Sequence, residues 1–174
     1  MEITIKKQFI EEALKYAELS KSFTSDTHDF HEGGLNAKQR KMFEGKLGEK
    51  GIKKFFIENN INFKEDKSSH EDADEYDFIV FGNPQKYLID VKTRTQKFHI
   101  RTLEMVKQLN RKKIDIYISV KLSNFQNNYK IKIIGWCTKQ EILKINRIEN
   151  NGYLDNYVLY DNELKNINDL KSFF

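Results

Sequence analysis

Residues 86–95 read K-Y-L-I-D-V-K-T-R-T, and this stretch decides the fold. Its aromatic and β-branched residues predict a strand. Residues two apart in a strand share a face, so Asp90 and Lys92 are expected to point the same way. Asp90 interrupts an otherwise apolar run, where a carboxylate is unfavourable unless something positive lies beside it.

A second strand precedes this one. Residues 75–81 read E-Y-D-F-I-V-F, which is again rich in aromatic and β-branched side chains. Between the two lies G-N-P-Q at residues 82–85, a turn by composition that holds the only proline of the chain. The sequence therefore predicts a hairpin.

The length of the turn sets the pairing of the hairpin. A turn of two or four residues places Asp77 opposite Asp90, and Glu75 opposite Lys92. Opposed side chains have Cβ atoms about 4.5–5.5 Å apart, so two carboxylates there repel each other unless a cation separates them. Mg²⁺ prefers such oxygen ligands. A turn of odd length would instead direct Asp77 to the other face.

Length and composition indicate one soluble domain. The 174 residues are 39% hydrophobic and 32% charged, with a net charge of +4. The 30 Lys and Arg residues permit a basic patch for nucleic acid without demonstrating one. The single cysteine, Cys137, excludes an internal disulfide, and a reducing cytoplasm is the simplest location. We find no apolar run of the ~20 residues that span a membrane, and no signal peptide.

Periodicity and turn residues predict the remaining elements. They are, in chain order, a helix over 3–21, a loop over 22–36, a helix over 37–59 capped by Asn36, a strand over 61–66, an acidic loop over 67–74, the hairpin, a helix over 103–113, strands over 114–120 and 129–137, a helix over 138–146, a strand over 157–160 and a last turn over 168–174. We expect one domain over 1–174, with its core at about 37–121 and a C-terminal extension over 128–174. Gly45, Gly48 and Gly51 inside the second helix indicate either a close approach of other atoms or a break.

This order of elements, with its acidic residues, resembles the PD-(D/E)XK nuclease superfamily. Asp77 matches the first acidic position of that family, and Asp90-Val91-Lys92 matches its acidic-x-Lys tripeptide. The segment G-E-K-G-I at 48–52 matches the glutamate segment of its first helix. No proline precedes Asp77, and the tripeptide has Asp where Glu is commoner. The resemblance covers about residues 37–121.

The resemblance implies the fold and the chemistry. The fold would be a restriction-endonuclease-like α/β core, with a mixed central sheet in the order α-β-β-β-α-β flanked by helices, an extra N-terminal helix and C-terminal β/α additions. Mg²⁺, with Mn²⁺ able to substitute, would be held by Asp77, Asp90, the backbone carbonyl of Val91 and Glu49, the last directly or through a water. Lys92 would orient or deprotonate the attacking water, or stabilise the charged phosphate. Burial and a nearby cation would lower its pKa.

The implied substrate is nucleic acid, in the first place double-stranded DNA, and members that cut both strands are often homodimers. Phosphate contacts are predicted for Arg94, Lys97, Lys107 and Arg111. A solvated basic surface explains these four residues equally well.

Several alternatives stay open at this point. Glu44 competes with Glu49 as the helical carboxylate, and Glu49 can instead pair with Lys53. Lys92 can simply pair with Glu75 across the hairpin. The chain can be a catalytically inactive member of the same fold that only binds nucleic acid or a protein, or it can cleave RNA.

Overall fold

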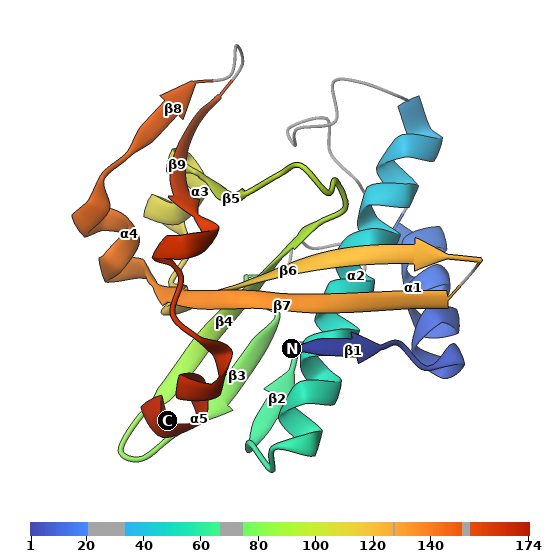
Figure 1. Cartoon of the computed structure of the whole chain (residues 1–174), viewed down its shortest axis with the longest axis horizontal. Helices are drawn as coiled ribbons and strands as arrows, with labels where there is room; N and C mark the ends of the chain where they lie inside the picture. Colours follow the sequence, from blue (N-terminus) through green and yellow to red (C-terminus); the bar gives the residue numbers. More distant parts are fainter. Residues whose placement is uncertain (21–33, 67–74, 127, 151–153) are drawn as a thin grey trace.

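The computed structural model describes residues 1–20, 34–66, 75–126, 128–150 and 154–174 (Figure 1). The larger of its two sheets has six strands in the order β1-β7-β6-β4-β3-β2, and the smaller has three in the order β5-β9-β8. Strands β4 and β6 run parallel, whereas every other pair is antiparallel. The chain therefore has a mixed α/β fold.

The bounds of the elements are as follows. The larger sheet contains β1 (Glu2–Thr4), β2 (Phe63–Glu65), β3 (Phe78–Phe81), β4 (Lys86–Arg94), β6 (Ile116–Phe125) and β7 (Asn128–Thr138). The smaller sheet contains β5 (Arg101–Met105), β8 (Ile148–Asn150) and β9 (Asp155–Tyr160). The helices are α1 (Lys7–Leu19), α2 (Gly34–Glu58), α3 (Val106–Arg111), α4 (Lys139–Ile145) and α5 (Leu170–Phe173), with short 3-10 turns η2 (Asp161–Glu163) and η3 (Ile167–Asp169) before α5.

The strand β6 separates two hydrophobic clusters because its side chains alternate between faces. Ile116, Ile118 and Val120 pack into the main core, which also receives the apolar face of α2. Tyr117 points to the other side, where it packs with Leu109, Tyr157 and other residues of α3, α4 and β9. The larger sheet is thus covered by α2 on one face and by the smaller sheet with its helices on the other.

Helix α2 lies close against β4 because two of its glycines leave room. A Cβ on Gly48 would collide with the side chain of Thr93 on β4, and a Cβ on Gly51 would collide with Ile131 on β7. Gly45 has open space around it. The helix is continuous from Gly34 to Glu58, so close approach, not a break, explains the two inner glycines.

The hairpin of β3 and β4 has the predicted even turn. Phe81 is paired with Lys86, and Ile79 with Leu88. The ladder ends at Phe78 and Ile89, before it reaches Asp77.

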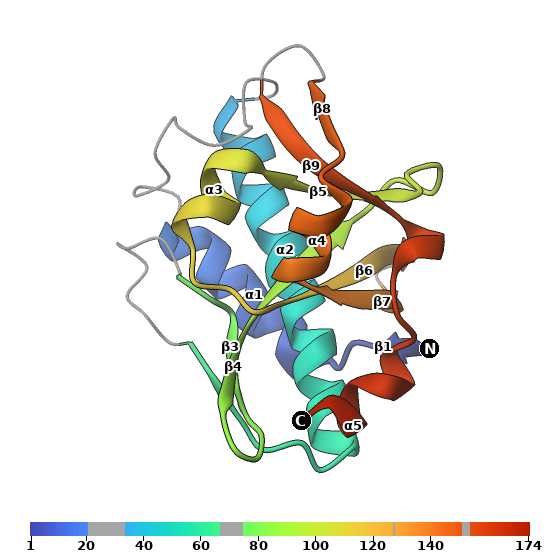
Figure 2. The same cartoon turned by 90° about the vertical axis from the view of Figure 1, so that its left-hand side faces the viewer.

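Most predicted elements are present, with shifted bounds. The helix over 138–146 is confirmed as α4, and Thr138 and Glu141 form the expected capping box. Three strands, β1, β5 and β8, were not predicted. Figures 1 and 2 show β5, β8 and β9 grouped with α3 and α4 at one end of the molecule, and the β3–β4 turn with α5 at the other.

Three predictions of helix bounds are wrong. The N-terminal helix does not begin at residue 3, because Glu2–Thr4 adds β1 to the edge of β7 and buries Ile3 and Ile5. Asn36 does not cap the second helix, which begins at Gly34. The helix over 103–113 is reduced to α3, because residues 101–105 pair with β9. The predicted loops at 22–36 and 67–74 fall almost entirely on residues 21–33 and 67–74, outside the described residues.

None of the described helices is both long enough and apolar enough to cross a membrane.

Candidate active site

The centre of the candidate site is the face of β4 that looks toward the smaller sheet. Asp90 and Lys92 share this face as predicted, and the Nζ of Lys92 lies 2.8 Å from the Oδ2 of Asp90. Asp90 is 6% exposed. A second ammonium, that of Lys112, lies 3.6 Å from the Oδ1 of Asp90. These two lysines hold the pKa of Asp90 below its ordinary value, against the effect of its burial, so the carboxylate is charged at neutral pH.

Asp77 reaches the same strand by a different route from the predicted one. Its N–H donates to the carbonyl of Ile89, and it is not the ladder partner of Asp90. Its Oδ2 accepts a hydrogen bond of 2.6 Å from the N–H of Val91, the middle residue of the tripeptide. The prediction of direct cross-strand opposition is therefore wrong, because the regular ladder ends one residue earlier.

Burial and neighbouring carboxylates both disfavour the charged form of Asp77. Burial raises the pKa of Asp77 well above its ordinary value, and the charges of Glu49 and Asp90 raise it further. Lys46 and the Val91 N–H act in the opposite direction and are outweighed. Among the described residues, Asp77 has no ion-pair partner.

Of the two candidate carboxylates on α2, Glu49 is the one whose charge acts on Asp77. Glu49 is buried on α2, and its Oε2 lies 2.7 Å from the Nζ of Lys46 one turn earlier. Glu44 forms an ion pair of 2.8 Å with Arg40 and is not among the groups that shift the pKa of Asp77.

The alternative pairings considered for Glu49 and Lys92 are not formed. Lys53 pairs with Glu65 at 2.5 Å and not with Glu49. Glu75 is exposed outside β3, whereas Lys92 pairs with Asp90 and with a residue on β5.

That residue is Glu104, which sequence reasoning missed. It is 4% exposed, and its Oε2 forms an ion pair with the Nζ of Lys92. Burial and the charge of Asp90 raise the pKa of Glu104, and Lys92 only partly offsets them. Polar and apolar residues alternate in T-L-E-M at 102–105, which is a sequence signal for a strand. In the structure Thr102 and Glu104 are buried and Leu103 is exposed. An apolar residue on the outside and an acid on the inside is the reverse of the usual strand pattern.

In the metal-free structure the pKa of Lys92 is not lowered, and the lowering expected from a bound cation stays a prediction. Burial favours the neutral amine, but the neighbouring charges of Asp90 and Glu104 outweigh it and raise the pKa of Lys92 above its ordinary value. Lys92 is therefore an ammonium group at neutral pH. In this charged form it can orient a phosphate and stabilise negative charge.

The donor chemistry at β4 fits a divalent cation, although the side chains do not form a finished coordination shell. Among the described residues, no group of three or more acidic, histidine or cysteine side chains is placed to hold a metal ion. The oxygens of Asp77 and Asp90 are nevertheless hard ligands of the kind that Mg²⁺ prefers. A cation between them would relieve the repulsion that raises the pKa of Asp77.

The four residues predicted to contact phosphate lie in different surroundings. Lys97, Lys107 and Arg111 are exposed. Arg94 is buried, and its guanidinium donates to the Arg101 carbonyl, the Ser119 hydroxyl and the Asp161 carboxylate. Arg94 would have to break these bonds to reach a phosphate, so the structure gives it a role in joining β4 to β5, β6 and η2.

Comparison with known proteins adds little to this picture. No family model matches the chain, and no curated protein matches it. Among solved structures it is similar to D212, a nuclease from a fusselovirus, with 10% identity and a TM-score of 0.37 over 70% of this chain and 81% of that one. At this TM-score, neither the fold nor the activity of the present chain follows from the likeness.

Proposed function

We propose that this protein is a divalent-metal-dependent nuclease of the PD-(D/E)XK type, and that it hydrolyses phosphodiester bonds as a DNA endonuclease. The observation that carries the proposal is the arrangement around one strand. Asp90 and Lys92 lie side by side on β4, and the carboxylate of Asp77 is fixed to the backbone between them. Glu49 adds a third carboxylate, close enough to raise the pKa of Asp77.

The roles follow from the charges of these groups. A bound Mg²⁺ would supply an activated water and neutralise charge on the phosphate, and Asp77, Asp90 and the Val91 carbonyl would hold it, with Glu49 acting directly or through a water. Lys92 contributes a fixed positive charge, because two carboxylates hold its ammonium in place. Such a preoriented charge stabilises the negative charge that develops on the phosphoryl oxygens.

The substrate we propose is double-stranded DNA. Lys97, Lys107 and Arg111 are exposed and able to meet its phosphates. Cleavage of both strands would call for a homodimer, and the same metal chemistry would also cleave RNA.

One observation favours a second candidate, a catalytically inactive protein that only binds nucleic acid. Lysine side chains already neutralise part of the acidic group, because Lys46 pairs with Glu49 and Lys92 with Asp90. A fold without a metal can be stable with these pairs in place.

Cleavage of supercoiled plasmid in Mg²⁺ or Mn²⁺ separates the two functions. The wild-type chain should nick or cut the plasmid, and Asp90→Asn and Lys92→Ala should each abolish this. Asp169→Asn and Lys64→Ala, at exposed positions outside the site, serve as matched controls with unchanged activity. Salt-dependent binding without cleavage in either metal would support the inactive protein instead. A radiolabelled RNA of matched length tests the RNA alternative.

A further inference from the structure

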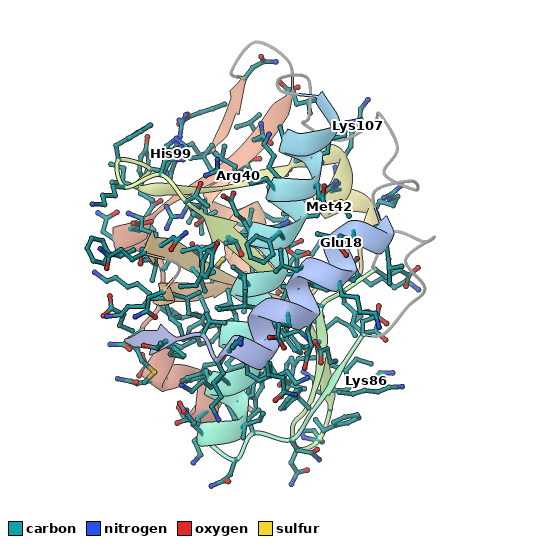
Figure 3. All side chains as sticks on the ribbon, turned by 90° about the vertical axis from the view of Figure 1, so that its right-hand side faces the viewer. Glu18, Arg40, Met42, Lys86, His99 and Lys107 are labelled. Carbon is teal, nitrogen blue, oxygen red and sulfur yellow. The ribbon has the colours of Figure 1, made fainter. Side chains whose placement is uncertain are left out.

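A groove of about 410 Å³ opens beside the candidate site. Lys41 and Glu44 of α2 line one side of it, and His99, Arg101 and Leu103 line the other. Lys92 on β4 also lines the groove, so the groove adjoins the candidate site. Figure 3 labels His99 on the segment that runs into β5 and Arg40 on α2.

Basic and apolar side chains alternate in sequence along the segment that forms this wall. Residues 97–101 read K-F-H-I-R. Phe98 is 74% exposed and Ile100 is 58% exposed, although they are large apolar side chains. The ring of Phe98 contacts the imidazole of His99 edge-on, with 4.6 Å between the ring centroids. Single exposed apolar residues are common on proteins, but here two of them flank a residue that lines the same groove as Lys92.

The charges beside the groove select an anionic partner. Lys41, Lys92 and Arg101 line it, and Glu44 is the acid opposite them. Part of this positive charge is neutralised, because Lys92 pairs with Asp90 and Glu104 on the site side and Arg101 pairs with Glu149. The acid Glu44 is in turn paired with Arg40. The exposed Lys97 adds positive charge at the tip of the segment. A groove with basic lining residues and an exposed aromatic ring next to it in the chain is the pattern by which proteins hold unpaired nucleic-acid strands.

We infer that residues 95–101 form a nucleobase platform, on which the ring of Phe98 stacks against an unpaired base while the adjoining groove holds the sugar-phosphate chain. The inference deepens the proposed function and rests on it, since it names an unpaired nucleotide as the feature recognised next to the cleaved bond. A volume of about 410 Å³ is that of a small-ligand pocket, which suits one strand at a time. Flapped, mismatched or branched DNA would present such a nucleotide within an otherwise double-stranded substrate.

Binding in EDTA tests the platform independently of cleavage. The probe is a fluorescent single-stranded oligonucleotide, compared with its duplex and with a duplex that carries a short flap. Base stacking on an aromatic ring predicts that Phe98→Ala weakens binding to the single strand and to the flap by roughly 5- to 150-fold. Phe98→Tyr should retain binding, whereas Phe98→Leu, which keeps an apolar side chain without a ring, should lose it.

Two other phenylalanines provide controls. Phe125 is 75% exposed on the β6–β7 hairpin, and Phe81 is 46% exposed at the β3–β4 turn. Neither lines the groove. Phe125→Ala and Phe81→Ala should leave binding unchanged within twofold.

The outcomes separate this inference from the proposed function. Normal plasmid cleavage with binding that is indifferent to Phe98→Ala and Phe98→Leu would overturn the platform and leave the nuclease standing. Ring-dependent binding without cleavage in any metal would support the platform and overturn the nuclease. Loss of a dimer in Phe98→Ala, seen by light scattering while oligonucleotide binding persists, would overturn the platform and assign Phe98 to contact with a second copy of the chain.

Discussion

Glu104 on the smaller sheet forms an ion pair with Lys92 on the larger one. The ammonium is thereby fixed from two sides, because Asp90 holds it from its own strand. The two sheets meet at this point, so the position of the proposed catalytic lysine depends on how β5 docks against β4.

Glu104→Gln is expected to separate activity from stability. Lys92 keeps Asp90 as a partner after the change, so the loss in free energy of unfolding should stay below the roughly 3–5 kcal/mol that a buried charge left without any partner costs. The loss of one anchor for Lys92 should lower kcat by roughly tenfold, which corresponds to 1.4 kcal/mol of barrier, with little change in KM. Urea unfolding and steady-state cleavage measure the two effects. Glu149→Gln, which removes the partly exposed partner of Arg101, is the control, and an unchanged kcat in Glu104→Gln would contradict the role.

Asp77→Asn is expected to stabilise the metal-free protein at neutral pH. The pKa of Asp77 is raised in the folded state, so the folded chain binds a proton more tightly there than the unfolded chain does. Protonation of Asp77 therefore stabilises the folded state fully at pH values below its ordinary pKa of 3.8. This stabilisation is lost as the pH rises through the raised pKa of the folded state. Asparagine carries no charge and can still accept from the Val91 N–H.

The difference in Tm between Asp77→Asn and the wild type should accordingly grow as the pH rises from 4 to 7, measured by calorimetry in EDTA. A variant that is less stable than the wild type at pH 7 would show that Asp77 is not under repulsion in the folded protein.

Mg²⁺ and Mn²⁺ are expected to raise the Tm of the wild type. A ligand at 100 times its Kd stabilises the folded state by about 2.7 kcal/mol. Asp90→Asn should remove the shift, because it loses the central carboxylate, whereas Asp169→Asn should retain it. An equal shift in Asp90→Asn and in the wild type would place the metal elsewhere on the protein.

Gly48→Ala and Gly45→Ala are expected to have opposite effects. The new methyl group at position 48 would collide with Thr93 and press α2 away from β4, with a loss of about 1–3 kcal/mol from overpacking. The same change at position 45 meets open space and should stabilise the helix by about 0.5–1 kcal/mol. Chemical denaturation of both variants compares them directly. Similar effects at the two positions would show that α2 is not held by close contact at Gly48.

The parts of the site that could be predicted from the sequence are those set by local geometry. Asp90 and Lys92 share a face because strand residues two apart always do, and the four-residue turn fixed the pairing of Phe81 with Lys86. The position of Asp77 relative to Asp90 was not predicted, because the β3–β4 ladder ends at Phe78 and no local sequence feature marks that end.

The rest depends on partners that are distant in the sequence. Residues 101–105 form a strand because β9, more than fifty residues later, pairs with them. Without that strand Glu104 could not be placed beside Lys92, so the second carboxylate that raises the pKa of Lys92 in the metal-free protein was not foreseen. Ile3 and Ile5 likewise become buried only when β7 provides an edge for β1.

The central claim is that Asp77 and Asp90 bind one divalent ion beside Lys92. Anomalous diffraction from a crystal soaked in Mn²⁺ tests it most directly. We expect a manganese peak about 2.0–2.3 Å from a carboxylate oxygen of Asp77 and from one of Asp90, with Glu49 as the nearest acid on α2. A crystal with saturating Mn²⁺ and no peak at these carboxylates, or a peak held by other residues alone, would contradict it.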